Sequence, residues 1–203
     1  MRGHFKICDS FRQKAEGGFS NNPRDPGGPT AKGVSLRAVV RLDRNKDGVL
    51  DFDLDHDGDV DLADMKALMD ERYEGKIEEF YRGEYWNPIR GDELKWPWCL
   101  LVYDAALNHG VSAAVLLLQK AVGAQPDGRM GPQTVLLANN AGPNRGRMFL
   151  AHRGVLFSRI AEARGGVKVY GDILLGWFKR EFDLQFEIDT LRPGDGLEAP
   201  GAR

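Results

Sequence analysis

The fold is decided by residues 98–122, WCLLVYDAALNHGVSAAVLLLQKAV, a stretch rich in Leu, Val and Ala. Neither this stretch nor the rest of the sequence alternates steadily between apolar and polar residues, as half-buried strands would. The stretch predicts one or two helices, with Asn108-His109-Gly110 as the expected break. We therefore expect a mostly α-helical fold around this segment.

Helices are also expected on both sides of the central stretch, where apolar residues recur at three- and four-residue spacing. These predicted helices cover residues 1–18, 65–81, 131–141, 144–164 and 171–189. Between the first two lies FSNNPRDPGGPTAKG, residues 19–33, with three prolines and three glycines. Such a composition is typical of a turn-rich loop, so no helix is expected there.

The size and composition exclude several classes of protein. The chain has 203 residues, of which 42% are hydrophobic and 29% charged, so it can bury one good core and is not a disordered chain. No run approaches the ~20 apolar residues of a membrane helix, and MRGHFKICDSFRQ at the start lacks the apolar region of a signal peptide. We expect no stable membrane insertion and a chain that stays where it is made. Cys8 and Cys99 are expected to be reduced and buried.

Charge is distributed unevenly along the chain. The formal net charge is −2, but residues 43–64 carry nine Asp against Arg44 and Lys46, a local charge of −7. The remaining chain has 26 basic and 21 acidic residues and a net charge of +5. A mildly cationic body suits a polyanion such as cell wall. No recognised nucleic-acid motif is present, so nucleic acid is not an expected partner.

Residues 53–64, DLDHDGDVDLAD, have the spacing of an EF-hand-type calcium loop. Alternate residues of such a loop point oxygens inward, and Gly58 at position 6 permits the sharp turn. The acidic residues at positions 1, 3, 5, 7, 9 and 12 are Asp53, Asp55, Asp57, Asp59, Asp61 and Asp64. Asp at position 12, followed by a helix, resembles the dockerin version of the loop. We call residues 53–64 the second acidic loop and expect it to bind a structural Ca²⁺.

An overlapping register fits the same pattern less well. In residues 43–54, the first acidic loop, the candidate ligands are Asp43, Asn45, Asp47 and Asp51. Position 12 is Leu54, which has no oxygen to offer, and position 11 is Asp53 of the second loop. Either Asp53 serves two ions or only one site is well formed. Magnesium is disfavoured at both loops because it demands a tighter octahedral geometry.

The chemistry is expected where the first predicted helix ends. Glu16 stands at that end, next to Gly17-Gly18, and Asp25 and Thr30 follow nine and then five residues later. A carboxylic acid facing a loop cleft can protonate a leaving oxygen, and a second oxygen group can place a water. This order of Glu, Asp and Thr is similar to that of phage-type lysozymes.

A longer set of motifs resembles glycoside hydrolase family 108, the endolysin-type N-acetylmuramidases. The string AEGGFSNNPRDPGGPTAKGVS, residues 15–35, is similar to the N-terminal signature of that family. The resemblance continues in FYRGEYWNPIRGDEL (80–94), YDAALNHG (103–110) and GWFKR (176–180). Residues 118–134, LQKAVGAQPDGRMGPQT, resemble the family's C-terminal predicted peptidoglycan-binding region.

The resemblance implies a lysozyme-like helical fold, and the acidic spacing predicts that an EF-hand or dockerin-like calcium loop is inserted in it over residues 43–64. The catalytic region would cover residues 1–110, a helical lobe 111–190 and a flexible tail 191–203. Glu16 matches the family's proposed catalytic acid, while Asp25 and Thr30 match signature positions. The positions matched to the cleft or core, where they would contact substrate, are Tyr85, Trp86, Asn108 and His109.

The implied function is a peptidoglycan hydrolase that cleaves the β-1,4 bond between N-acetylmuramic acid and N-acetylglucosamine and causes bacterial lysis. Such an endolysin is expected to act as a monomer, to accumulate in the host bacterial cytoplasm and to reach the periplasm and cell wall at lysis. That release implies a holin-type partner. Two alternatives stay open: a lytic transglycosylase that leaves anhydro ends, and a non-enzymatic calcium-dependent binding module.

Overall fold

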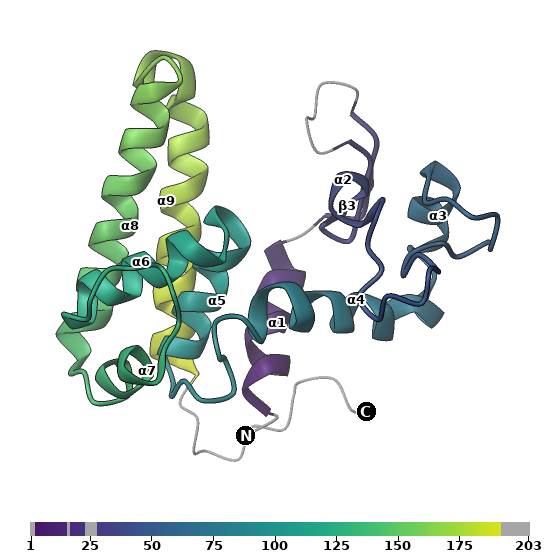
Figure 1. Ribbon diagram of the computed structural model, residues 1–203. Helices are drawn as coiled ribbons and strands as arrows, with labels where there is room; N and C mark the ends of the chain where they lie inside the picture. Colours follow the sequence, from purple (N-terminus) through teal and green to yellow (C-terminus); the bar gives the residue numbers. More distant parts are fainter. Residues whose placement is uncertain (1–2, 16, 23–27, 192–203) are drawn as a thin grey trace. The chain divides into compact units, whose positions relative to one another are not determined.

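The chain is mostly helical over the residues that the structure, a computed structural model, describes: 3–15, 17–22 and 28–191 (Figure 1). The α-helices, in chain order, are α1 (Gly3–Ala15), α2 (Leu36–Val39), α3 (Leu62–Ala67), α4 (Glu74–Tyr81), α5 (Trp98–His109), α6 (Val111–Val122), α7 (Pro132–Asn139), α8 (Pro143–Ala163) and α9 (Val167–Thr190). A 3₁₀ turn, η1 (Glu71–Tyr73), precedes α4, and a π-helix, η2 (Arg82–Trp86), follows it. The expectation of a mostly α-helical fold is confirmed.

A small antiparallel sheet lies within the segment predicted as a loop. Its strands are β1 (Phe19–Ser20), β2 (Thr30–Ala31) and β3 (Val34–Ser35), in the order β1-β2-β3. The prediction for residues 19–33 misses this sheet because strands of two residues carry no alternating pattern. The β2–β3 pairing is set instead by a tight two-residue turn between the strands.

The chain divides into two compact units. One unit is continuous in sequence, Ser10–Tyr81, and the other joins Met1–Asp9 to Arg82–Arg203. Helix α1 therefore contributes residues to both units. The boundary expected at residue 110, between a catalytic region and a C-terminal lobe, is a functional division and stays a prediction.

The Ser10–Tyr81 unit is built from short elements around an apolar core. Its buried side chains come from α1, the small sheet, α2, both acidic loops, α3 and α4; the largest apolar ones are Phe11, Phe52, Met65, Leu68, Ile77, Phe80 and Tyr81. Phe52 and Phe80 pack edge-on with ring centroids 5.7 Å apart. The acidic loops are thus anchored to this core by the apolar residues between their carboxylates.

The larger unit is a helical bundle built on the central apolar stretch. Helix α5 is buried from Trp98 through Ala106, as expected of a helix that is apolar all round. Helix α6 packs against both α5 and α8, and α8 pairs with α9 as a long hairpin (Figure 1). The predicted break between α5 and α6 is confirmed at Gly110, whose φ of 82° ends one helix and begins the next.

Helices α7 and α8 each begin with a proline, Pro132 and Pro143, where the missing N–H costs nothing. Cys8 and Cys99 are buried and free, as expected. Among the described residues, no helix combines the length and apolar character required to cross a membrane.

Candidate functional site

The hairpin between β2 and β3 holds one residue in an uncommon conformation. Lys32 has a φ of 47° and Gly33 a φ of 81°, so both lie in the left-handed region that a tight hairpin turn requires. Asn or Gly at the first of these positions is the usual choice, and a lysine there is conformationally strained.

The backbone of Lys32 is fixed by hydrogen bonds from three directions. Its N–H donates to the carbonyl of Gly18 over 3.3 Å. Its carbonyl accepts from Arg12 Nη1 over 3.2 Å and from the Tyr81 hydroxyl over 3.3 Å. The Arg12 guanidinium is itself buried and lies 3.8 Å from the centroid of the Tyr81 ring. Helices α1 and α4 thereby hold the turn in place.

A cavity of about 260 Å³ lies beside this turn. Its lining includes Gly17, the side chains of Lys32 and Glu74, and the apolar side chain of Ile77. Lys32 and Glu74 form an ion pair across 42 residues of sequence. The cavity thus combines one buried wall with a pair of opposite charges next to the end of α1.

The predicted catalytic residues are only partly within the described structure. Glu16 and Asp25 lie outside the described residues, and Gly17, the sequence neighbour of Glu16, lines the cavity. Thr30 lies in β2, half-buried, and its hydroxyl donates to the carbonyl of Gly28 over 3.3 Å. The roles of Glu16, Asp25 and Thr30 stay predictions.

Two of the predicted substrate contacts lie on η2, in the larger unit. Trp86 is completely buried, and the rings of Phe5 and Tyr103 pack edge-on against it at 5.2 and 5.5 Å. Gly91 permits this packing, because a Cβ there would lie 2.3 Å from the Trp86 ring. Trp86 therefore has no exposed face on which a sugar could stack. Tyr85, its neighbour, is half-buried.

The other two predicted contacts lie at the end of α5. The Asn108 amide donates to the carbonyl of Asp104, one turn back in the same helix, over 2.7 Å. His109 Nε2 accepts from Arg153 Nε over 3.3 Å, and its ring lies 4.9 Å from that of Phe157. Burial, and then the positive charge of Arg153, lower the pKa of His109 to about 4. His109 is thus a neutral, packed imidazole at neutral pH.

A buried charge cluster joins α5, α8 and α9. The Asp104 carboxylate lies 2.6 Å from Arg153 Nη1 and 2.8 Å from Arg180 Nη2. Burial raises the pKa of nearby Glu181 to about 7, despite the opposing effect of Arg153. Arg153 on α8 and Arg180 on α9 both face Asp104 on α5, so ion pairs connect the three helices.

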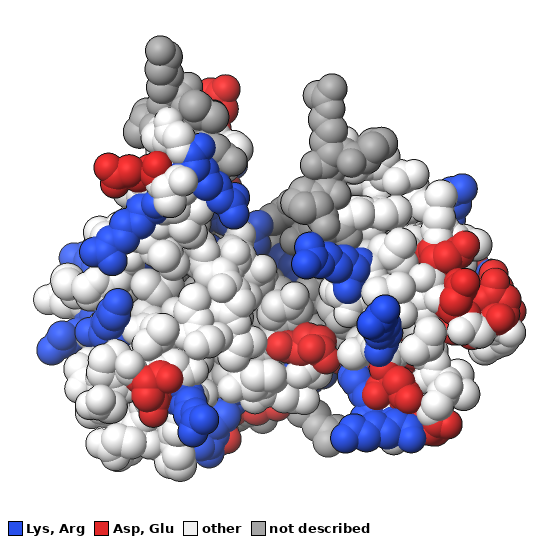
Figure 2. Space-filling view, turned by 45° about the horizontal axis from the view of Figure 1, so that its top comes forward, with Lys and Arg blue, Asp and Glu red and all other residues white. Residues whose placement is uncertain are grey.

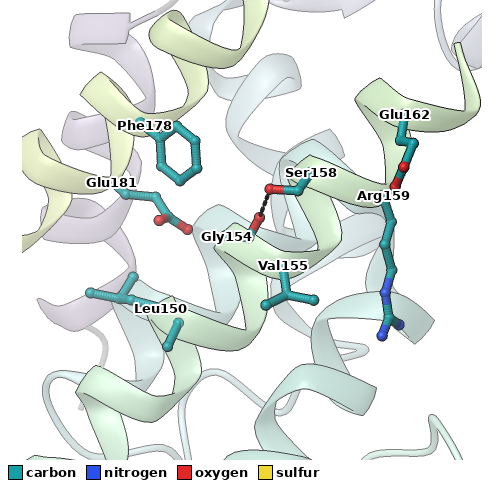
Figure 3. Close-up of a pocket in the computed structure, with 9 residues that line it drawn as sticks. Leu150, Gly154, Val155, Ser158, Arg159, Glu162, Phe178 and Glu181 are labelled. Carbon is teal, nitrogen blue, oxygen red and sulfur yellow. Dashed lines mark hydrogen bonds between the residues drawn. The ribbon is translucent and has the colours of Figure 1, made fainter. Parts of the chain in front are cut away.

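Glu181 also borders a cavity of about 470 Å³ between α8 and α9 (Figure 3). Figure 3 shows Phe178 and Glu181 on α9 facing Leu150, Gly154 and Ser158 on α8. The lining is largely apolar, and the cavity belongs to the unit that contains the expected C-terminal lobe.

Within the C-terminal motif, residues 118–134, the buried side-chain amide of Gln119 makes several hydrogen bonds to the loop that follows α6. Gln119 Nε2 donates to Asp127 Oδ1 over 2.7 Å and to the carbonyl of Arg129 over 3.0 Å. Gln119 Oε1 accepts the N–H of Gly128 over 2.9 Å. These bonds fix the loop between α6 and α7, so this part of the motif serves the fold. The predicted binding of peptidoglycan by this region stays a prediction.

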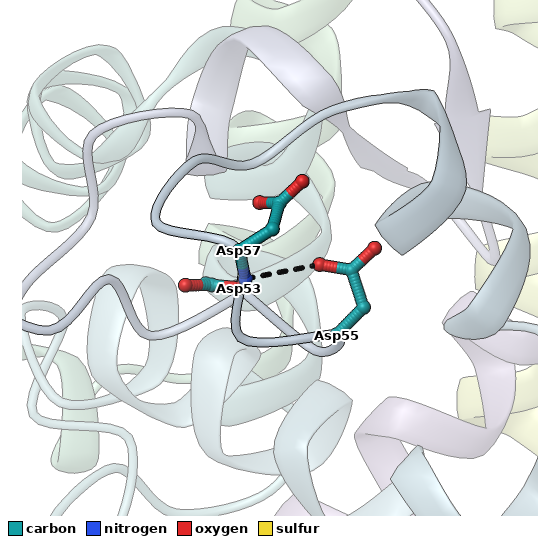
Figure 4. Close-up of side chains that lie close together, drawn as sticks. All are labelled: Asp53, Asp55 and Asp57. Atoms are coloured by element: carbon teal, nitrogen blue, oxygen red, sulfur yellow. Dashed lines mark hydrogen bonds between the residues drawn. The ribbon is translucent and has the colours of Figure 1, made fainter.

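The second acidic loop turns sharply at Gly58, whose φ is 98°. The carboxylates of Asp53, Asp55 and Asp57 lie close together in this loop (Figure 4). Oxygens of Asp53, Asp55 and Asp57 lie within 4.8 Å of one another, as do those of Asp59, Asp61 and Asp64. Repulsion and desolvation raise the pKa of two exposed members: desolvation leads for Asp55, and the charge of Asp57 leads for Asp59. Figure 2 shows acidic side chains gathered over this part of the chain, around α3.

The loop ends in a helix cap. Asp64 is buried, and its two oxygens accept the N–H groups of Leu54 over 2.6 Å and of Asp61 over 2.8 Å. Asp61 in turn accepts the N–H of Ala63 over 2.5 Å, which completes a capping box at the start of α3. Asp64 thereby has two roles: it closes the loop through Leu54, and it caps the start of α3 through Asp61.

The first acidic loop has a similar backbone turn but ends differently, because Leu54 stands at its position 12. The Asp43 carboxylate accepts the N–H of Gly48 over 3.0 Å, as Asp53 does from Gly58. Asn45 donates to Asp47 Oδ2 over 2.8 Å. Asp51 is engaged by Arg44 Nε over 2.5 Å, so its charge is already neutralised within the loop.

The structure adds three residues near the cavity that the sequence did not single out: Arg12, Lys32 and Glu74. Lys32-Gly33 at a hairpin turn is the local signal that could have drawn attention to Lys32. Nothing local marks Glu74 or Arg12, because their contacts with the turn join segments 42 and 20 residues apart.

Comparison with known proteins identifies the family. The profile of the family described as Glycosyl hydrolase 108 matches residues 11–110. Among solved structures, that of Brucella abortus SagA is similar, with a TM-score of 0.71 and 25% sequence identity over 97% of this chain and 100% of that chain. A search among curated proteins finds no match.

The family match runs from α1 through the small sheet, both acidic loops and α5, and the structural likeness to SagA extends over nearly the whole chain. The mostly helical architecture is consistent with a lysozyme-like fold. Together they support a hydrolase that acts on peptidoglycan. Residues 11–110, about half of the chain, match the glycosyl hydrolase 108 family, and this match supports a glycoside hydrolase.

Proposed function

We propose that this hydrolase cleaves the β-1,4 bond between N-acetylmuramic acid and N-acetylglucosamine, with Glu16 as the general acid. The observation that carries the proposal is the family match over residues 11–110, which includes the segment directly after α1. A carboxylic acid in that segment can protonate the glycosidic oxygen as the bond breaks. The cationic sugar that develops is then attacked by water.

The attacking water needs a group to orient it. Asp25 and Thr30 are the proposed candidates, since one offers a carboxylate base and the other a hydroxyl. The Thr30 hydroxyl directs its hydrogen to Gly28, so its oxygen remains able to accept a hydrogen from a water. A carboxylate that accepts the proton of the water contributes more than a hydroxyl that only positions it.

The test is mass spectrometry of muropeptides released from purified Gram-negative sacculi. Wild type is expected to release fragments with reducing N-acetylmuramic ends, and Glu16→Gln to release none. Glu71→Gln, which neutralises an exposed carboxylate on η1, serves as the matched control and should keep full activity. Full activity of Glu16→Gln would refute the proposed acid.

The same measurement separates the alternatives. Anhydro ends in place of reducing ends would identify a lytic transglycosylase, in which no water is used and Asp25 loses its proposed role. No release by wild type in the presence of calcium would instead favour a calcium-dependent binding module.

We also propose that the second acidic loop holds a structural Ca²⁺. Its clustered carboxylate oxygens are the hard ligands that Ca²⁺ prefers, and the positive φ of Gly58 gives the sharp turn of such loops. The ion would neutralise the crowded Asp53, Asp55 and Asp57 and tie the loop to α3. It takes no part in bond cleavage in this proposal.

The biological setting follows from these proposals. A wall hydrolase of this kind would act on bacterial peptidoglycan as a monomer and cause lysis. It would accumulate in the host cytoplasm and reach the wall once a holin-type partner opens the membrane. The helical lobe of residues 111–190 would contribute wall binding. Lysis of host cells only when both proteins are expressed would support this order of events.

A further inference from the structure

A strained residue that is held from several sides invites a functional explanation. Lys32 occupies a left-handed position that Asn or Gly would adopt more easily, and Gly18, Arg12 and Tyr81 all bond to its backbone. The hairpin requires a left-handed backbone at position 32, but it does not require a lysine side chain there. The lysine side chain therefore has to be explained by what it does in the cavity.

The Lys32 ammonium is placed to meet a ligand. It lines the cavity beside Gly17 and is paired with Glu74, also in the lining. The Glu74 side chain is 51% exposed and that of Lys32 21% exposed, so solvent screens the pair and a competing carboxylate can replace Glu74. The Arg12 guanidinium is buried against Tyr81 and bonded to the Lys32 carbonyl, so it is already engaged.

We propose that Lys32 is a specificity-determining residue that binds a free carboxylate of the peptide stem on the wall glycan. This inference rests on the proposed function, because it assumes that peptidoglycan enters the cavity. The sugars of the glycan offer neutral hydroxyl and amide groups, whereas its peptide stems carry free carboxylates. Lys32 thus distinguishes peptide-bearing wall from a neutral polysaccharide, and Glu74 holds the ammonium in position until the substrate arrives.

Two substitutions separate the charge of Lys32 from its conformation. Lys32→Asn suits the left-handed position better and removes the cation, while Lys32→Arg keeps the cation and the strain. If the residue served only the turn, Lys32→Asn would match or exceed wild type in every assay. We expect Lys32→Asn to melt at or above the wild-type temperature and yet to bind wall about 10-fold more weakly, as loss of a charge-assisted hydrogen bond would give. Lys32→Arg should bind within about 2-fold of wild type.

Binding is measured by cosedimentation with sacculi in the Glu16→Gln background, so that no bond is cleaved. One batch of sacculi is left native, and in the other the free carboxylates are converted to amides with carbodiimide and ammonium. Amidation should weaken binding of the Glu16→Gln protein by the same factor as Lys32→Asn does on native sacculi. It should have no further effect on the double variant.

Two outcomes would overturn the inference: equal binding of the Glu16→Gln protein and its Lys32→Asn derivative to native sacculi, or equal weakening of both by amidation. Glu74→Gln provides a second test, since it should bind native sacculi at least as tightly as its parent, and weakening to the level of Lys32→Asn would contradict the assignment. Failure of the proposed function is a separate result, because it appears as absence of muropeptide release by wild type.

Discussion

The two acidic loops follow nearly the same backbone path and differ in how they close. In both, the first carboxylate accepts the N–H of the turn glycine over 3.0 Å, and that glycine has a positive φ. At the closing position, the first loop has Leu54 and the second has the buried Asp64. Turn geometry therefore does not distinguish the two loops. They differ at the closing position, where only Asp64 offers carboxylate oxygens and caps the start of α3.

The largest effect is expected from Asp64→Ala. The substitution removes the capping box of α3, worth about 1–2 kcal/mol, and the closing ligand for calcium, worth about 3 kcal/mol when calcium is saturating. The free energy of unfolding should fall by about 4 kcal/mol in calcium, measured by urea denaturation. In the first loop the closing position is Leu54, so the comparison is made at its last carboxylate: Asp51→Ala breaks only a partly exposed ion pair with Arg44 and should cost less than about 1 kcal/mol. Equal losses would show that the two loops are energetically equivalent.

Removal of calcium is expected to have the next largest effect. A ligand at 100 times its dissociation constant stabilises the folded state by about 2.7 kcal/mol. For a chain of this length, thermal denaturation in EDTA should therefore occur about 5–10 °C lower than in calcium. Magnesium at the same concentration is the control and should restore little of the shift. An unchanged melting temperature would show that neither loop binds the ion.

Alanine substitutions at Gly48 and Gly58 test whether the positive φ of the turn costs the same free energy of unfolding in both loops. A Cβ at Gly48 or Gly58 would meet no atom within 4 Å, so the cost arises from the positive φ alone. Each substitution should cost about 1 kcal/mol in EDTA. In calcium, Gly58→Ala should cost more than Gly48→Ala, because only the second loop then loses bound ion. A larger cost for Gly48→Ala would reverse the comparison.

The smallest effect is expected from completing the first loop. Leu54→Asp supplies a carboxylate at its closing position and should add a second, weaker calcium site, seen by isothermal titration calorimetry as a rise from one ion per chain to two. Leu54→Asn adds a neutral group of similar size and should leave the stoichiometry at one. Two ions bound by wild type would mean that the first loop is already complete without residue 54.

The features that the sequence predicted well are local ones. The break at Gly110 and the glycine turns of the acidic loops each depend on a few adjacent residues, and the structure has them where the pattern placed them. Helix α9 begins at Val167, four residues before its predicted start, directly after the Gly165-Gly166 turn. Here the turn, rather than the apolar spacing, decides where the helix begins.

The features that could not be predicted depend on distant partners. The three-stranded sheet is too short to leave a pattern, and the ion pair between Lys32 and Glu74 joins a hairpin to α4 across 42 residues. Trp86 illustrates the same limit. Aromatic residues suit both sugar stacking and core packing, and only the positions of Phe5 and Tyr103 show that its ring is enclosed.

The discontinuous unit has a consequence for how the chain is made. Phe5 packs against Trp86 and Tyr103, so the first nine residues belong to a unit whose remaining residues begin at Arg82. On a ribosome that adds about 5–20 residues per second, these residues emerge on the order of ten seconds before α5 and α6 are complete. The Ser10–Tyr81 unit is by then fully synthesised. Residues 1–9 are therefore made before the Ser10–Tyr81 unit, and their partners in the larger unit are made only after it.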